Sequence, residues 1–419
     1  MALPHTLNGA LRMIRSPQLR NAAVYLGFSV LTSAIGFAAV MITTRLMPPS
    51  EYGLVGVFFS ILFFVAPVVS LSAESLIAVN KSELDPARYR EFQQTYLALA
   101  YASFLVLQTL FVLAWAMGVF KSALLIGAPL FGLVRFLAGM AATEYVVEQR
   151  AVMLGVMTAA TSLVALGLTV LMIELFSPWG GYRVIAMFTA DLMMLGVRYW
   201  RRFDLLTQPR WQRATAAQLL RFGLPSLIAV AGGWALNESD KIVVAREAGM
   251  HAAGVYAAAA ALAAIMTTFN QSLTNALYPE MFRRLANCEG RVRPILVRYA
   301  AGFVVFACIF CAAVLVVYYF VADLLLPARY LGGSDVFVGL LLAGIAVCFY
   351  RPFGLVAEFL KLGRLRAAAI VLGGLVTIVV ADVGVRQGSL LWAPAGVALG
   401  YCCAAAMLAV GLWWLEKQK

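Results

Sequence analysis

The sequence has 419 residues, of which 63% are hydrophobic and 12% are charged, and its mean hydropathy is +0.88. Soluble domains carry roughly 25% charged residues, so this composition excludes a soluble globular protein and predicts an all-α polytopic membrane protein. A net charge of +12 would suggest a nucleic-acid partner for a soluble chain. In a membrane protein the cations instead report orientation, and we expect no nucleic-acid partner.

Twelve apolar runs are long enough to cross a bilayer, since a helix needs about 20 apolar residues to span the hydrocarbon core. Short loops connect nearly all of them, so we predict twelve transmembrane helices. In chain order these helices are expected at residues 22–44, 54–78, 94–116, 122–143, 151–173, 182–197, 219–243, 253–278, 299–322, 336–357, 367–385 and 390–414.

The cations are divided unequally between the two ends of these helices. With a cytoplasmic N-terminus, 23 of the 32 Lys and Arg residues fall on the inner side and seven on the outer side, while Arg135 and Arg351 lie well inside spans. Because cations in short loops resist translocation, we predict that both termini are cytoplasmic. The outer loops are too short for an extracytoplasmic catalytic domain, and we expect no enzymatic activity.

The two halves of the sequence share short matches at corresponding helices. Arg45 precedes Gly53 by the same spacing as Arg246 precedes Gly254, and a helix follows each pair. The stretch TEYVVEQR after the fourth predicted helix matches AEFLKLGR after the tenth. These matches predict two six-helix lobes related by a parallel internal repeat. The expected lobes are residues 1–200 and 219–419, joined by a basic cytoplasmic linker at 201–218.

Two short motifs resemble those of a known transporter family. They are Arg45-x-x-x-Pro49-x-x-Tyr52-Gly53 and Asn237-x-x-Asp240-Lys241 followed by Gly254-x-Tyr256. In these motifs the chain is similar to the bacterial oligosaccharide-lipid flippases of O-antigen and polysaccharide assembly, which belong to the multidrug/oligosaccharidyl-lipid/polysaccharide exporter superfamily. The related lipid II flippases are longer and have fourteen helices, which disfavours a peptidoglycan precursor as substrate.

The resemblance implies a flippase that moves an undecaprenyl-pyrophosphate-linked oligosaccharide across the bacterial inner membrane by alternating access, for cell-surface polysaccharide synthesis. Its partners would be this lipid-linked substrate, the bilayer and other polysaccharide-assembly proteins, with no cofactor and no metal site. A coupling cation is an open question, and Asp191 and Glu74 are candidate carriers. The alternatives are a multidrug or cation antiporter of the same superfamily and a membrane glycosyltransferase or polymerase.

A polar cluster interrupts the seventh predicted helix. Asn237, Asp240 and Lys241 share one helical face, and Glu238 can reach Lys241 at a spacing of three. Asp240 is 19 residues beyond Arg221, which places it about 28 Å along the helix and near the outer interface. The cluster is either a local ion pair, tolerated because it is near water, or an outer gate. Arg45 and Arg246 are further candidates for the same gating or ion-pair role.

Two arginines are expected near the middle of the membrane. A central cation costs roughly 3 kcal/mol on insertion scales, so Arg135 and Arg351 should face a cavity or a partner. The substrate that the resemblance implies carries a pyrophosphate, which a guanidinium binds through parallel hydrogen bonds. For Arg135 the alternative is a salt bridge with Asp191. The eighth helix adds a polar stripe for sugar hydroxyls or helix packing, at Thr267, Asn270, Gln271 and Thr274.

Overall fold

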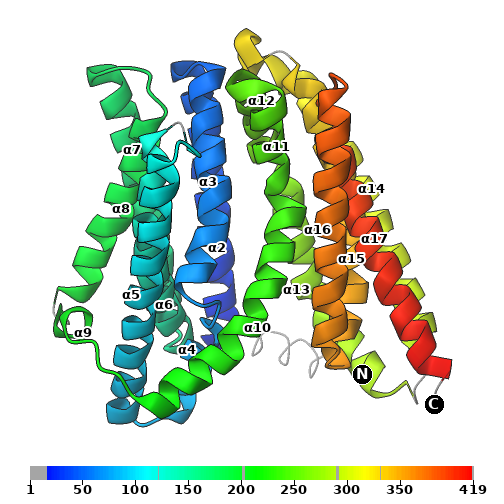
Figure 1. The fold of residues 1–419 in the computed structure, drawn as a ribbon. Helices are drawn as coiled ribbons and strands as arrows, with labels where there is room; N and C mark the ends of the chain where they lie inside the picture. Colours follow the sequence, from blue (N-terminus) through cyan, green and yellow to red (C-terminus); the bar gives the residue numbers. More distant parts are fainter. Residues whose placement is uncertain (1–16, 121, 201–202, 289–291, 331, 418–419) are drawn as a thin grey trace, which may run out of the picture. The chain divides into compact units, whose positions relative to one another are not determined.

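The computed structural model describes residues 17–120, 122–200, 203–288, 292–330 and 332–417. Arg201 and Arg202 of the predicted linker lie outside the described residues, as do Arg12, Arg15, Lys121, Arg291 and Lys419, which contributed to the predicted orientation. Within the described residues all regular structure is helical, as the sequence predicts (Figure 1).

Eleven helical segments within the described residues are long and apolar enough to cross a membrane. They correspond to eleven of the twelve predicted runs. The remaining run forms α8 (Gly181–Tyr199), which carries Arg183, Asp191 and Arg198 among its 19 residues. Each of the eleven segments contains an 18-residue stretch with at most two charged residues, and the three charges of α8 leave it without such a stretch.

Two compact units make up the chain, and the first consists of residues up to Ala39 together with 65–177 and 182–224. Its interior contains an aromatic contact between Tyr96 and Phe136, whose ring centroids are 4.8 Å apart. The elements with all or much of their length in this unit are α2 (Pro17–Leu46), α4 (Ser75–Glu83), α5 (Pro86–Ala116), the 3-10 helix η1 (Ala123–Gly127), α6 (Ala128–Val147), α7 (Ala151–Leu175), α8, and α9 (Phe203–Thr207).

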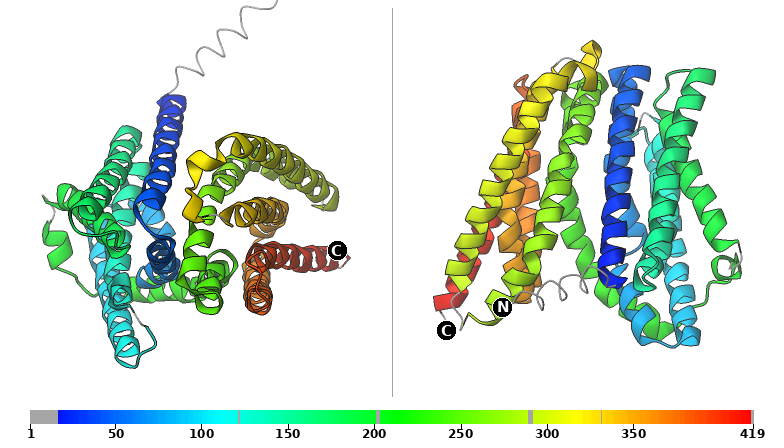
Figure 2. Two further views of the ribbon diagram at one scale, coloured as in Figure 1. Left: turned by 90° about the horizontal axis from the view of Figure 1, so that it is seen from above. Right: turned by 180° about the vertical axis from the view of Figure 1, so that it is seen from behind.

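The second unit consists of residues 40–64, 178–181 and 225–419. In it, α15 lies between α14 and α17 (Figure 2), and α16 packs along α17. Its elements are most of α3 (Pro49–Val69), the later part of α10 (Arg213–Asn237), α11 (Ser239–Glu247), α12 (Gly249–Ala263), α13 (Ile265–Ala286), α14 (Val292–Leu325), the 3-10 helix η2 (Ala328–Tyr330), α15 (Gly333–Phe359), α16 (Gly363–Arg386) and α17 (Trp392–Lys417).

Helix α3 crosses α12 at two glycines that the sequence repeat treats as equivalent. A methyl group on Gly53 would overlap the carbonyl oxygen of Met250, and one on Gly254 would overlap that of Pro49. Met250 and Pro49 each lie four residues before the facing glycine, so the contacts are reciprocal. Such backbone approach requires residues without a side chain, as in small-residue helix crossings of membrane proteins.

Three predicted helices are each divided in the structure. Helix α3 ends at Val69 because Leu71 and Ser72 adopt left-handed backbone conformations, with φ of 51° and 49°. At this turn the Ser70 carbonyl accepts from the Ala73 N–H at 3.2 Å and from the Tyr96 hydroxyl at 2.7 Å. The predicted helix at 219–243 stops at Asn237 and resumes as α11, and the next one divides between Ala263 and Ile265.

Candidate functional site

Arg351 is held by neutral groups on a neighbouring helix. It lies on α15, and its guanidinium donates from Nε to Thr274 Oγ1 at 3.2 Å and from Nη2 to Gln271 Oε1 at 3.4 Å. Within the described residues, no carboxylate oxygen lies within 4.0 Å of this guanidinium. The positive charge of Arg351 is therefore solvated by protein dipoles and not neutralised by an ion pair.

The polar stripe of α13 supplies these contacts, so two features predicted separately from the sequence lie together. Asn270 is 8% exposed, and its side-chain oxygen has no hydrogen-bond partner among the described residues. Gln271 also donates to Asn275 at 3.0 Å, while Thr267 is exposed on the same helix. The α13 stripe thus holds Arg351 of α15, which has several N–H donors, and it also contains the buried Asn270 oxygen that lacks a donor. Pro352 follows Arg351 directly, and α15 is continuous through this proline.

Arg135 differs from Arg351 because it has an acidic partner. Its Nε lies 2.8 Å from Asp191 Oδ2, which realises the salt bridge that the sequence left open. The Asp191 side chain is 8% exposed, whereas that of Arg135 is 41% exposed. The guanidinium therefore retains accessible donors after forming the pair.

A cavity of about 490 Å³ in the first unit contains both members of this pair, and this volume lies in the range of small-ligand pockets. Thr158, Thr161 and Ser162 of α7 also line it. Each of these hydroxyls donates to a carbonyl of its own helix, at 2.8 to 3.0 Å. A hydroxyl has one donor and two acceptor lone pairs, so the three residues can still accept hydrogen bonds from a ligand. The sequence analysis missed them because isolated Ser and Thr are routine in membrane helices.

A second ion pair joins the same two helices as the first. Arg198 on α8 donates to Glu144 on α6 at 2.6 Å, and Glu144 also accepts from Tyr89 at 3.1 Å and from Gln93 at 2.5 Å. The pair is buried and its polarity is opposite to that of the first pair, since here α6 supplies the acid. In the sequence, Arg198 is one of the cations at the inner ends of predicted helices, and no local pattern identifies Glu144 as its partner.

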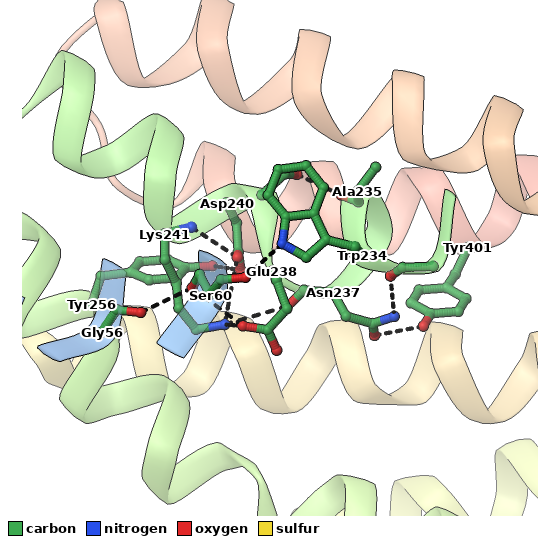
Figure 3. Close-up of polar contacts among 12 residues, drawn as sticks. Gly56, Ser60, Trp234, Ala235, Asn237, Glu238, Asp240, Lys241, Tyr256 and Tyr401 are labelled. Carbon is green, nitrogen blue, oxygen red and sulfur yellow. Dashed lines mark hydrogen bonds and ion pairs between the residues drawn. The ribbon is translucent and has the colours of Figure 1, made fainter. Parts of the chain in front are cut away.

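The cluster around Glu238 lies at the break between α10 and α11 in the second unit, with Asp240 buried and Glu238 and Lys241 partly buried (Figure 3). Lys241 Nζ is 2.9 Å from Glu238 Oε2 and 3.7 Å from Asp240 Oδ1. Asp240 accepts from the Tyr256 hydroxyl at 2.6 Å, and Ser60 of α3 lies 3.2 Å from Glu238. The side chain of Asp240 is only 3% exposed. The pairing predicted from the sequence is present. The position of the cluster near the outer interface stays a prediction.

Among the other predicted gate residues, Asn237 contacts this network through its backbone carbonyl, which accepts from Lys241 Nζ at 3.3 Å. Asn237 is exposed and accepts at its amide oxygen from the Tyr401 hydroxyl, at 2.7 Å. Arg246 pairs with the adjacent Glu247 at 3.0 Å. Arg45 is exposed, and its backbone carbonyl accepts from Arg329.

Glu74 is the second predicted cation carrier. It is exposed at the residue that precedes α4, in contrast to the buried Asp191. The roles of all these side chains in gating or coupling stay predictions.

Comparison with known proteins identifies the family of the chain. Residues 42–332, more than half of the sequence, match the family described as polysaccharide biosynthesis protein. The chain belongs to this family. A search of curated protein sequences returns no match.

Solved transporters share the fold at low sequence identity. An inward-facing multidrug resistance MATE family transporter of the MOP superfamily superposes with a TM-score of 0.71 at 14% identity, covering 95% of this chain and 98% of that one. The lipid II flippase MurJ in an inward closed conformation gives a TM-score of 0.67 at 10% identity, covering 93% and 87%. A MOP superfamily transporter from Pyrococcus furiosus gives 0.56 at 14% identity, covering 94% and 93%. The chain is thus a multi-pass membrane protein with a MOP transporter fold.

Proposed function

We propose that this protein is a flippase that moves an undecaprenyl-pyrophosphate-linked oligosaccharide from the cytoplasmic to the outer leaflet of the bacterial inner membrane. Family membership and the transporter fold support the class of function. The fold gives no reason to assign an enzymatic reaction. The remaining question is which side chains would recognise the substrate.

The uncompensated charge of Arg351 is the observation that carries the proposal. A guanidinium inside a membrane helix costs roughly 3 kcal/mol and normally meets a carboxylate or a functional anion. Here Gln271 and Thr274 hold it without neutralising it. A pyrophosphate would supply the missing negative charge through two parallel hydrogen bonds. The cationic drug of a multidrug antiporter would instead meet electrostatic repulsion.

Arg135 would contribute in a different way. Arg135 would either leave Asp191 and bind a substrate phosphate, or stay paired with Asp191 and donate to the phosphate from its exposed N–H groups. The acceptor lone pairs of Thr158, Thr161 and Ser162 in the same cavity suit sugar hydroxyls, which are hydrogen-bond donors. A cavity of this size would take only the part of an oligosaccharide next to the pyrophosphate.

We also propose twelve membrane spans in two six-helix lobes, at residues 1–200 and 219–419, with the linker 201–218 and both termini in the cytoplasm. The cation distribution supports the orientation, and the reciprocal contacts of Gly53 and Gly254 support the internal repeat. Transport would proceed by alternating access between the lobes, in association with other polysaccharide-assembly proteins.

The test is the appearance of lipid-linked oligosaccharide on the outer leaflet of vesicles containing Arg351 variants. Losing a hydrogen bond to a charged group costs about 1.5–3 kcal/mol, which is about a ten- to hundredfold loss of binding. We expect such a loss for Arg351→Gln and an intermediate loss for Arg351→Lys, which retains charge but lacks the fork.

Arg298→Ala provides the matched control, because Arg298 is an exposed arginine on α14. It should flip substrate at the wild-type rate at equal protein abundance. Normal flipping by well-expressed Arg351→Gln would refute the pyrophosphate role of Arg351.

A further inference from the structure

We propose that Glu238 binds and releases one proton, and that this protonation is coupled to movement at the break between α10 and α11. Proton binding at this carboxyl stands on the geometry of the cluster alone. Its coupling to substrate movement rests on the proposed flippase function.

The first argument is the charge of the buried cluster. It contains the carboxylates of Glu238 and Asp240 and the ammonium group of Lys241, with side chains 18%, 3% and 16% exposed. Among the described residues, Lys241 is the one cation that forms an ion pair with either acid. The fully ionised cluster thus carries one excess negative charge, which is costly in a low-dielectric interior. Uptake of one proton makes it neutral.

The hydrogen bonds indicate which acid takes the proton. Asp240 accepts from the Tyr256 hydroxyl at 2.6 Å and from the backbone N–H of Lys241 at 2.8 Å, and the Lys241 ammonium lies nearby. A carboxylate with several donors is stabilised in its ionised form. Glu238 Oε2 accepts from the Lys241 ammonium and from the Ser60 hydroxyl. Within the described part of the chain, no hydrogen-bond donor contacts Glu238 Oε1. Glu238 is therefore the easier group to protonate.

Ser60 can serve both protonation states of Glu238. Its hydroxyl lies 3.2 Å from Glu238 Oε2 and 3.0 Å from the carbonyl oxygen of Gly56, but it has one hydrogen to donate. With Glu238 ionised, that hydrogen can point to the carboxylate. With Glu238 protonated, Ser60 can donate to Gly56 and accept from the carboxylic acid. Trp234 fixes the Ser60 backbone by donating to its carbonyl at 2.6 Å.

Among the described residues, no element other than α11 brings a cation into an ion pair with Glu238. Tyr256 on α12 and Tyr401 on α17 are neutral phenols engaged with Asp240 and Asn237. On α16, Asp382 and Arg386 pair with each other at 2.9 Å, and Arg386 also pairs with Glu247 at the far end of α11.

The helix dipoles at the break act against each other. Glu238 precedes the N-terminus of α11, which favours a carboxylate, but its own N–H caps the C-terminal end of α10 by donating to the Trp234 carbonyl at 2.8 Å. The helix ends therefore do not offset the excess negative charge, and uptake of a proton would neutralise it.

Protonation would change how α3 is held to the break. The proton passes from water to Glu238 Oε1 or Oε2, and the resulting acid bonds less strongly to the Lys241 ammonium than the carboxylate does. The hydrogen bond between Ser60 of α3 and Glu238 is then reversed, with Glu238 as donor and Ser60 as acceptor. This gives proton binding a direct mechanical connection to the helix break.

Infrared difference spectroscopy of the protein in lipid vesicles tests proton binding without substrate. The acid-minus-neutral spectrum of the wild type should contain a carboxylic acid band that Glu238→Gln removes. Asp240→Asn makes the ionised cluster neutral, so the Glu238 band should then appear only at a pH lower by about one unit or more. Lys241→Met increases the excess negative charge, and the band should appear at higher pH.

Two controls and one coupling measurement complete the test. Glu174→Gln, at an exposed position near the end of α7, should leave the Glu238 band unchanged. An unchanged spectrum in Glu238→Gln, or an Asp240→Asn band at unaltered pH, would refute proton binding by Glu238. An imposed proton gradient should accelerate flipping by the wild type and not by Glu238→Gln. Gradient-independent flipping by the wild type would refute coupling but leave the flippase function intact.

Discussion

Arg135 and Arg351 appear alike in the sequence, and what distinguishes them is the group that each contacts. Both are single cations in apolar runs, which is enough to predict that they matter. The partners of Arg351 are 77 and 80 residues away on α13, and the partner of Arg135 is on α8. No local pattern reports which helices are neighbours. Sequence reasoning could therefore identify both residues and name Asp191 as one partner, but it could not find the unpaired state of Arg351.

Arg135→Ala should lower protein stability because it leaves the buried Asp191 carboxylate unpaired. We expect a loss of about 1–3 kcal/mol, smaller than for a fully buried pair because Arg135 is 41% exposed. Adding Asp191→Asn should restore thermal stability, measured by the loss of folded protein on heating in detergent. If Arg135 also binds substrate, the double variant will remain slow in flipping. Recovery of both stability and flipping would show that the pair is only structural.

The cluster around Lys241 predicts that exchanging its two neighbouring charges will not rescue function. In the wild type, the Lys241 ammonium lies 2.9 Å from Glu238 Oε2. Asp240→Lys combined with Lys241→Asp would place an acid beside Glu238 and a cation against the Tyr256 hydroxyl. We expect this variant to accumulate less than either single alanine variant. Glu238→Gln combined with Lys241→Met removes a whole ion pair and should accumulate better than Lys241→Met alone. Wild-type accumulation of the exchanged variant, measured by quantitative immunoblot, would contradict the contacts described.

At the level of elements, the helices could be predicted from apolar runs, but the interruptions could not. The breaks after Val69, Asn237 and Ala263 have no proline at the break itself, and Pro352 lies within a continuous helix. Breaks of this kind are fixed by tertiary partners, such as the Tyr96 hydroxyl that satisfies the carbonyl of Ser70. Hydropathy does not contain this information.

The crossing of α3 and α12 predicts a cost for the smallest side chain. Gly53→Ala or Gly254→Ala would place a methyl group on a facing backbone carbonyl, so the helices must separate. We expect each to lower thermal stability by about 1–3 kcal/mol, and the double variant to be less destabilised than the sum because both act at one crossing. Gly302→Ala on α14, where a methyl group meets nothing within 4 Å, should be neutral or stabilising. Equal behaviour of Gly254→Ala and Gly302→Ala would contradict the close approach.

For the whole molecule, the number of spans depends on α8. Its hydropathy is reduced by charges that look unfavourable when the helix is considered alone. Two of the three are neutralised by the same neighbour, since α6 supplies Arg135 to Asp191 and Glu144 to Arg198. The two pairs have opposite polarity, so they also fix the register of α6 against α8. The sequence predicted α8 as a span from its apolar run at 182–197, and the two ion pairs would make its charges tolerable in the bilayer.

We therefore predict that α8 crosses the membrane when α6 is intact. Reporter fusions at Pro178 and Pro209 should be outside and inside respectively, and a C-terminal fusion should be inside. Arg135→Ala combined with Glu144→Ala removes the α6 partners of Asp191 and Arg198, and each unpaired charge would cost roughly 3 kcal/mol in the bilayer. A measurable fraction of the Pro209 fusion should then appear outside, whereas Arg298→Ala should leave its location unchanged. An outside C-terminus in the wild type would mean that α8 does not cross, and it would overturn the arrangement of two six-helix lobes.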